Sequence, residues 1–257
     1  MDVFRLEPIV TAAAFVGVRI GSLMVFAPFF GSTAIAARVK AGLTVVLTGL
    51  LYSVIPSPQL PASLVEWIQL IANETLVGLL FGITIQFIFD AAQLAGQVLG
   101  IQMGFSLVSI LDPQTQADSP VLSIFQQMVV LLIFLQLDVH HWLLRGLAAS
   151  FTYVPAGLAT VNLTLISEVL RAAGGMWLAA IQIAAPALVA TMLADVALGF
   201  LGKASPQLPV LLVSLSVKSV LGLVVLVAAV GGWPRFFERH FTDAIVTGER
   251  LLQLAKG

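Results

Sequence analysis

Apolar residues occupy most of the chain in long runs, and these runs predict its helices. The runs lie at 9–30, 41–55, 64–89, 91–111, 121–137, 142–162, 169–202 and 207–233. Several exceed the roughly 18 residues that a bilayer-spanning helix needs, whereas 41–55 and 121–137 are short for one. Proline-rich or polar breaks separate the runs, notably at 55–61 and 112–119, because proline removes backbone donors. The pattern predicts an all-α protein built from membrane-associated helical hairpins.

Composition places the chain in or at a membrane. It is 59% hydrophobic and 10% charged, with a mean hydropathy of +1.04, well outside the range of soluble domains. A net charge of −1 argues against a nucleic-acid partner, because little basic surface is available to neutralise phosphates. The chain has no cysteine, which excludes disulfides and thiolate metal sites, and we expect no cofactor. The first run carries Arg19 and lacks a convincing cleavage site, so we expect a retained helix rather than a signal peptide.

Cationic residues are missing from a long stretch of the chain, between Lys40 and Arg145. Lysine and arginine normally mark the cytoplasmic ends of membrane helices, so we expect this stretch to be shielded in an assembly or to line a conduit. The orientation of the chain in the membrane cannot be assigned consistently from its cations. Lys203 and the basic tail would both prefer the cytoplasm, yet they lie on opposite sides of the single run 207–233. The helices are therefore not expected all to span a bilayer in the usual way.

A polar stripe follows one side of the helix expected at 82–104. At 100° per residue, its members fall close to one line; they are Gln86, Asp90, Gln93, Gln97, Gly100 and Gly104. Such groups need protein partners or water in a low-dielectric setting. The four-residue spacing of glycines favours close helix packing, whereas the glutamines favour a pore lumen or a seam between subunits. Both interpretations stay open.

Methionine and phenylalanine follow the polar stripe, at Met103 and Phe105. Because a thioether side chain is flexible and polarizable, this passage is suited to a deformable apolar seal. A buried turn in the core is an equally good interpretation of the same residues.

Isolated charges occur within or beside the apolar runs and are candidates for salt bridges, either between subunits or within a hairpin of this chain. They are Arg19, Glu74, Asp195, Lys203 and Lys218. Buried charges are costly and are usually paired, so we favour bridging over a proton relay.

The sequence Asp138-Val139-His140-His141 invites a metal-binding or acid–base interpretation. We expect the two neighbouring imidazoles to point in different directions on a helix, and we find no third ligand that completes a zinc set. An interfacial role at a helix end is favoured, with Trp142 as an aromatic-belt residue and no metal. Ser150 and His140 do not form a hydrolase site, because no strand–turn–helix nucleophile elbow is present.

Over nearly its full length the chain resembles the FliR family of flagellar export-gate proteins and the related T-type subunits of virulence secretion systems. The motifs that carry the resemblance are Arg19, Ala27-Pro28-Phe29-Phe30-Gly31, Ala37-Arg38-Val39-Lys40, Glu74, Gly78, Gly82, Ala95-Gly96-Gln97, Gly100, Gln102-Met103-Gly104-Phe105, Asp112-Pro113, Asp138-Val139-His140-His141, Ser150-Phe151, Pro155, Ala185-Pro186, Asp195, Leu198-Gly199, Lys203, Ser205-Pro206-Gln207 and Lys218. Ala36, Lys203 and Pro209 depart from the family's usual proline, arginine and asparagine.

The resemblance implies a single export-gate domain over 1–257, with a P-subunit-like portion at 1–165, a Q-like hairpin at 166–233 and a charged tail at 234–257. It implies a helical pore assembled in the bacterial inner membrane, at the flagellar basal body. The implied partners are P-type and Q-type subunits (FliP, FliQ), the B-type switch subunit (FlhB) and unfolded export substrates. No catalysis is expected.

The resemblance also implies that a loop near 104–121 plugs the closed channel. The plug residues are Met103, Phe105, Leu107, Val108, Ile110, Leu111, Asp112 and Pro113. Two alternatives remain. One is a T-type subunit of a virulence injectisome. The other is a small secondary transporter that couples protons or ions through Glu74, Asp90 or Asp195.

Overall fold

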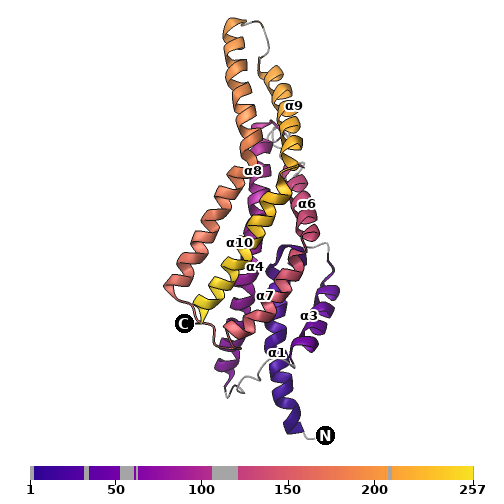
Figure 1. The fold of residues 1–257 in the computed structure, drawn as a ribbon, viewed down its shortest axis with the longest axis vertical. Coiled ribbons are helices and arrows are strands. Elements are labelled where there is room, and N and C mark those ends of the chain that lie inside the picture. The colour runs from indigo at the N-terminus through magenta and orange to yellow at the C-terminus, as the bar shows by residue number, and fades with distance from the viewer. Residues whose placement is uncertain are drawn as a thin grey trace. The chain divides into compact units, whose positions relative to one another are not determined.

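The computed structural model describes residues 3–31, 35–52, 61, 63–105, 121–205, 207 and 210–256. Within these ranges every regular element is a helix (Figure 1), which confirms the all-α prediction. The helices are α1 (Val3–Phe26), α2 (Pro28–Gly31), α3 (Ala37–Leu51), α4 (Leu64–Gln102), α6 (Val121–Gln136), α7 (Val139–Tyr153), α8 (Leu163–Ala204), α9 (Val210–Val230) and α10 (Trp233–Ala255).

One boundary differs from the hydrophobic pattern. The separate runs at 64–89 and 91–111 form one continuous helix, α4, as far as Gln102. Asp90 interrupts the apolar pattern but not the backbone, because an acidic residue keeps its N–H and fits a helix. Pro186 likewise lies inside α8 without ending it. Apolar runs therefore locate helices, whereas a single polar residue does not divide them.

Among the described residues, three helices are long and apolar enough to cross a membrane: α4, α8 and the Val213–Val230 part of α9. A fourth span exists if α6 and α7 are one broken span. In the most apolar windows, 61% of residues are buried in α4 but only 22% in α8 and 11% in α9. The first of these helices therefore belongs to the protein's core, and the other two present apolar surface outward.

The chain divides into two compact units, each assembled from separate segments. The first comprises Met1–Phe87, Leu137–Ala173 and His240–Gly257, and the second comprises Ile88–Gln136 and Gly174–Arg239. Helices α4, α8 and α10 each contribute to both units. The division into a P-like portion at 1–165 and a Q-like hairpin at 166–233 is a matter of family resemblance and stays a prediction.

Close packing in the first unit depends on glycines, which have no side chain. Helix α1 lies beside α3 (Figure 1) and also meets α4 at Gly78, where an added Cβ would lie 2.6 Å from the carbonyl oxygen of Arg19. The ring of Phe81 fills the space over two other glycines: a Cβ on Gly146 or Gly248 would lie 2.2 Å or 2.9 Å from that ring. Glycine here permits helix backbones to approach more closely than any other residue would.

The end of α10 is held by the segment that precedes α8. The backbone N–H of Thr160 donates to the carbonyl oxygen of Ala255 at 2.7 Å, and the Asn162 side-chain amide donates to that of Leu254 at 2.8 Å. The Asn162 side-chain oxygen in turn accepts the Leu165 N–H at 2.7 Å, which caps the start of α8. These bonds satisfy carbonyls that a helix end otherwise leaves without partners.

In the second unit, α6 packs against α4 at Gly96. An added Cβ on this glycine would lie 2.5 Å from the Cα of Ser123, and the Ser123 hydroxyl donates to the carbonyl oxygen of Gln93 at 3.1 Å. Because the nearest atoms belong to backbone, a side chain on Gly96 can be accommodated only by separating the two helices.

The change Gly96→Ala tests this packing. We expect it to lower the free energy of unfolding by about 1–3 kcal/mol, the usual effect of overpacking. A lower midpoint temperature of heat-induced aggregation in detergent extracts would report this loss. Gly199→Ala in α8 is the control, because a Cβ there has no neighbour within 4 Å and alanine favours a helix by roughly 1 kcal/mol. Equal midpoints for the two variants would contradict the close approach of α4 and α6.

Candidate functional site

A buried ion pair joins α1 to α4 in the first unit. The Arg19 guanidinium donates through Nε to Glu74 Oε2 at 2.6 Å and through Nη2 to Glu74 Oε1 at 3.1 Å. Neither side chain exposes any surface to solvent. The two-point contact between a planar guanidinium and a carboxylate is the strongest geometry for such a pair.

Further partners enclose both charges. Arg19 Nη1 donates to the Ser150 hydroxyl at 3.0 Å, and Nη1 and Nη2 both donate to the Val154 carbonyl oxygen at 3.1 Å. The Phe151 ring lies 4.0 Å from the guanidinium carbon. Because a guanidinium has five N–H donors, these contacts supply an acceptor for each one.

Glu74 is tied to the chain that follows α7. Its Oε1 accepts the backbone N–H of Gly157 at 2.7 Å, and Gly157 has φ +83, a conformation that glycine adopts without strain. Asn73, the preceding residue of α4, donates its side-chain amide to the Gly157 carbonyl oxygen at 2.8 Å. We call Arg19, Glu74, Ser150, Val154 and Gly157 the arginine clamp, since it connects α1, α4, α7 and the turn after α7.

The sequence identified the two charges of the arginine clamp but not its neutral members. The structure pairs Arg19 with Glu74 within the chain, which is the second of the two kinds of salt bridge that the sequence left open. Ser150 could have been suspected, because a hydroxyl in an apolar helix needs a partner. The roles of the Val154 carbonyl oxygen and the Gly157 N–H could not be inferred from the sequence, because every residue has a backbone carbonyl and nearly every one has an N–H.

A second polar group lies in the second unit. Lys218 Nζ of α9 lies 2.9 Å from Asp195 Oδ1 of α8, and the Gln102 side-chain amide donates to Asp195 Oδ2 at 2.9 Å. The side chains of Lys218 and Asp195 are 15% and 40% exposed. This pair also forms within the chain, and it connects α8 and α9, which form an antiparallel hairpin (Figure 1), to the end of α4. Lys203 is exposed in the last turn of α8.

The start of the expected plug loop is anchored at Met103. This side chain is fully buried and occupies the space over Gly222 of α9, where an added Cβ would lie 2.6 Å from the methionine methyl carbon. The Ser219 hydroxyl donates to the Met103 carbonyl oxygen at 2.7 Å. Gly104 then turns the backbone with φ +85, and Phe105 is partly exposed.

The other plug residues, Leu107, Val108, Ile110, Leu111, Asp112 and Pro113, lie outside the described residues. The described chain resumes at Val121, and Ser123 packs on Gly96 just beyond it. Met103 and Ser123, the packed residues on either side of positions 106–120, are therefore each held by a contact with a glycine in the second unit.

The polar stripe lies on α4 and the turn after it. Gln86, Asp90, Gln93 and Gln97 are half-buried and Gly100 is buried, whereas Gly104 is half-buried beyond the helix end. The structure supplies a packing partner near the stripe, because Ser123 of α6 contacts Gly96 and the Gln93 carbonyl. A pore-lining role for these residues stays a prediction.

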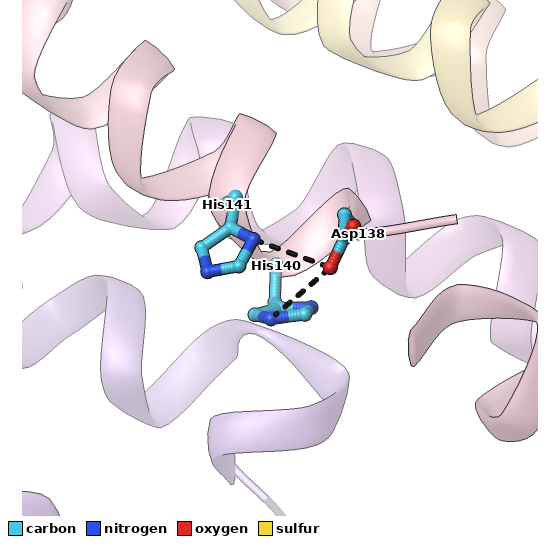
Figure 2. A group of neighbouring side chains, drawn as sticks. All are labelled: Asp138, His140 and His141. Atoms are coloured by element: carbon cyan, nitrogen blue, oxygen red, sulfur yellow. Dashed lines mark ion pairs between the residues drawn. The ribbon is translucent and has the colours of Figure 1, made fainter. Parts of the chain in front are cut away.

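Asp138, His140 and His141 lie together at the start of α7 (Figure 2). His141 Nδ1 lies 3.3 Å from Asp138 Oδ1 and His140 Nε2 lies 3.9 Å from the same oxygen. The two imidazole centroids are 4.1 Å apart. The expectation that the two rings point apart is wrong, because rotation about their side-chain bonds brings both back to Asp138, the residue before the helix.

The arginine clamp predicts an asymmetry between single and double substitutions. We expect Arg19→Met to lower the free energy of unfolding by about 3–5 kcal/mol, because it leaves the Glu74 carboxylate buried without its counterion. The double variant Arg19→Met with Glu74→Leu should lose less than that, because neither charge remains. The midpoint temperature of heat-induced aggregation in detergent extracts compares the stability of the single and double variants.

Arg171→Ala provides the control for that experiment. Arg171 pairs with Glu168 at 3.2 Å, but its side chain is 77% exposed, and exposed pairs contribute roughly 1 kcal/mol at most. A double variant that is less stable than Arg19→Met would show that the two charges act independently, contrary to the geometry.

Comparison with known proteins agrees with the resemblance seen in the sequence. Residues 10–244 match the family described as bacterial export proteins, family 1. The flagellar biosynthetic protein FliR of Bacillus subtilis is 31% identical over 240 residues, covering 92% of this chain and 93% of the relative. FliR of Pectobacterium carotovorum is 30% identical (88% and 87% covered) and that of Escherichia coli 28% (88% and 86%). The chain therefore belongs to the FliR family of bacterial export proteins, and is a membrane component of the flagellar export apparatus rather than an enzyme.

Proposed function

We propose that this chain is a core subunit of the flagellar type III export gate, in the bacterial inner membrane, where it closes a multi-subunit channel for unfolded flagellar proteins. One observation supports this proposal above the others: α8 and α9 have the length and hydropathy of membrane helices, yet 22% and 11% of the residues in their apolar windows are buried. So much apolar surface requires a cover of lipid or protein.

Protein is the better cover for the α8–α9 hairpin. The hairpin carries the Lys218–Asp195 pair, and Asp195 is 40% exposed. Charges that face lipid tails are expensive, so such groups normally face a bundle interior or a wet cavity. We therefore infer that neighbouring subunits pack here, and the resemblance assigns them as P-type and Q-type subunits (FliP, FliQ) with the B-type switch subunit (FlhB) close by.

The plug assignment rests on the two anchors of segment 106–120. Met103 and Ser123 flank the segment and are each packed on a glycine, and the sequence between them is apolar before Asp112-Pro113 and polar after it. We infer that the apolar part, from Leu107 to Leu111, closes the channel while the anchors stay in place. In this proposal Met103 is a fixed end of the plug rather than a moving part.

The other two interpretations receive less support. A transporter that cycles protons through Glu74 would have to break the arginine clamp at each step, since the carboxylate accepts hydrogen bonds from Arg19 and Gly157. A T-type injectisome subunit is disfavoured by the flagellar relatives, which match over most of the chain.

Cysteine cross-linking tests the assembly. Because the chain has no cysteine of its own, Val224→Cys places a single thiol on α9 at a position that is 62% exposed. We expect this thiol to cross-link to a cysteine on a co-expressed Q-type or P-type subunit. Leu226→Cys, at a position that is 2% exposed, is the matched control and should not cross-link. Labelling of the Val224→Cys thiol only by lipid-soluble maleimide, with no cross-link to any subunit, would contradict the proposal.

Deletion of residues 106–117 tests the plug. We expect a membrane with the P-type and Q-type subunits co-expressed to become permeable to ions, because the anchors remain and the seal is gone. Ion-dependent growth arrest and conductance in planar bilayers measure the leak, at equal levels of the chain. The same deletion expressed without the partners should give no leak. An unchanged conductance of the intact assembly would overturn the plug assignment but not the subunit assignment.

A further inference from the structure

We propose that Asp138, His140 and His141 form a binding site for one divalent transition-metal ion, with zinc as the reference ion. This group takes no part in the arginine clamp or in the plug described above. The proposal concerns the side-chain cluster at the start of α7 (Figure 2) and is independent of the export function.

The three side chains offer ligand atoms in a small volume. One oxygen of Asp138 lies 3.3 Å from His141 Nδ1 and 3.9 Å from His140 Nε2, and ligand atoms of all three lie within 4.8 Å of one another. Around a tetrahedral zinc with bonds of about 2.0–2.1 Å, ligand atoms are roughly 3.3–3.4 Å apart. The distance from Asp138 Oδ1 to His141 Nδ1 already has this value. The other distances between ligand atoms must shorten, which rotations of these partly exposed side chains allow.

The local backbone keeps this arrangement in place. Asp138 has φ +55, the left-handed conformation that aspartate tolerates better than most residues, and its carbonyl oxygen accepts the N–H groups of His141 and Trp142 at 2.9 Å and 3.4 Å. The backbone of Asp138 is therefore fixed just before the first turn of α7, and from there one carboxylate oxygen lies close to both rings. The ligand residues come from one short segment, so no movement between distant parts is needed to complete the site.

The chemistry of the ligands selects the class of ion. Two imidazoles and one carboxylate suit zinc, copper, nickel or iron, whereas calcium and magnesium prefer oxygen ligands alone. Three protein ligands leave at least one coordination position for water or a further group. The Asp138 and His141 side chains are 65% and 58% exposed, so an ion can enter from solvent.

One effect opposes the site. The N-terminus of a helix carries partial positive charge, which disfavours a cation there. The Asp138 carboxylate offsets this, because one of its oxygens lies 3.3 Å from His141 Nδ1 and 3.9 Å from His140 Nε2, and a carboxylate ligand brings negative charge to the ion. We expect its removal to weaken binding even where both histidines remain.

Titration of the purified full-length chain, in detergent and without a histidine tag, tests the proposal. We expect one Zn²⁺ per chain by calorimetry, and one Co²⁺ with an absorption spectrum that reports nitrogen and oxygen ligands. Asp138→Asn and His141→Ala should each weaken binding by at least about ten-fold, the lower end of what a perturbed metal site loses. His240→Ala in α10 removes an imidazole elsewhere and should change nothing.

The outcomes separate cleanly. Saturable binding of one ion that is weakened by Asp138→Asn and His141→Ala but not by His240→Ala supports the site. Absence of saturable binding, or equal affinity in all the variants, overturns it. Circular dichroism and elution volume establish that each variant is folded, and His140→Ala provides a third ligand change should either of the first two fail to fold.

Discussion

The guanidinium of Arg19 imposes the strictest condition on the first unit. A charged group with no exposed surface is tolerated only if its donors all have acceptors and its charge has a counterion. Those partners come from α4, α7 and the turn after α7, so these elements must all be in place before any one of them is satisfied. The arginine clamp therefore selects one arrangement of the chain, whether or not it adds to stability beyond what an apolar replacement would give.

Glycine makes that arrangement sterically accessible. Gly78 lets α4 reach the Arg19 carbonyl, and Gly146 and Gly248 leave room for the ring of Phe81. The second unit uses the same device, since Met103 packs over Gly222 and Ser123 over Gly96. In an apolar protein few polar contacts are available to fix helix positions, so shape and backbone approach carry that role. The glycine positions and the arginine clamp act together, because a hydrogen bond can form only where the helices are already close.

The sequence predicts the helices well, because the length of apolar runs and the position of prolines are local properties. It also isolates Arg19 and Glu74 as charges that need partners. The polar stripe already requires a helix through Asp90, but the hydrophobic pattern does not predict that this helix begins as far back as Leu64, because it shows two separate apolar runs. Nor does it predict the directions of His140 and His141, which depend on side-chain rotation and on the left-handed Asp138. The neutral partners Val154 and Gly157 are backbone groups, and their role follows only from tertiary structure.

The missing cations between Lys40 and Arg145 have a partial physical explanation in these contacts. Glu74 lies inside that stretch, but its counterion Arg19 comes from outside it. Gln102, also inside, binds Asp195 as a neutral donor, and Lys218 supplies the charge from α9. The stretch thus contributes α4 and α6 to the core, while elements outside it supply the cations of the Arg19–Glu74 and Lys218–Asp195 pairs. A conduit wall assembled from such helices would attract neither anionic lipid nor acidic segments of an unfolded substrate by direct cationic contact.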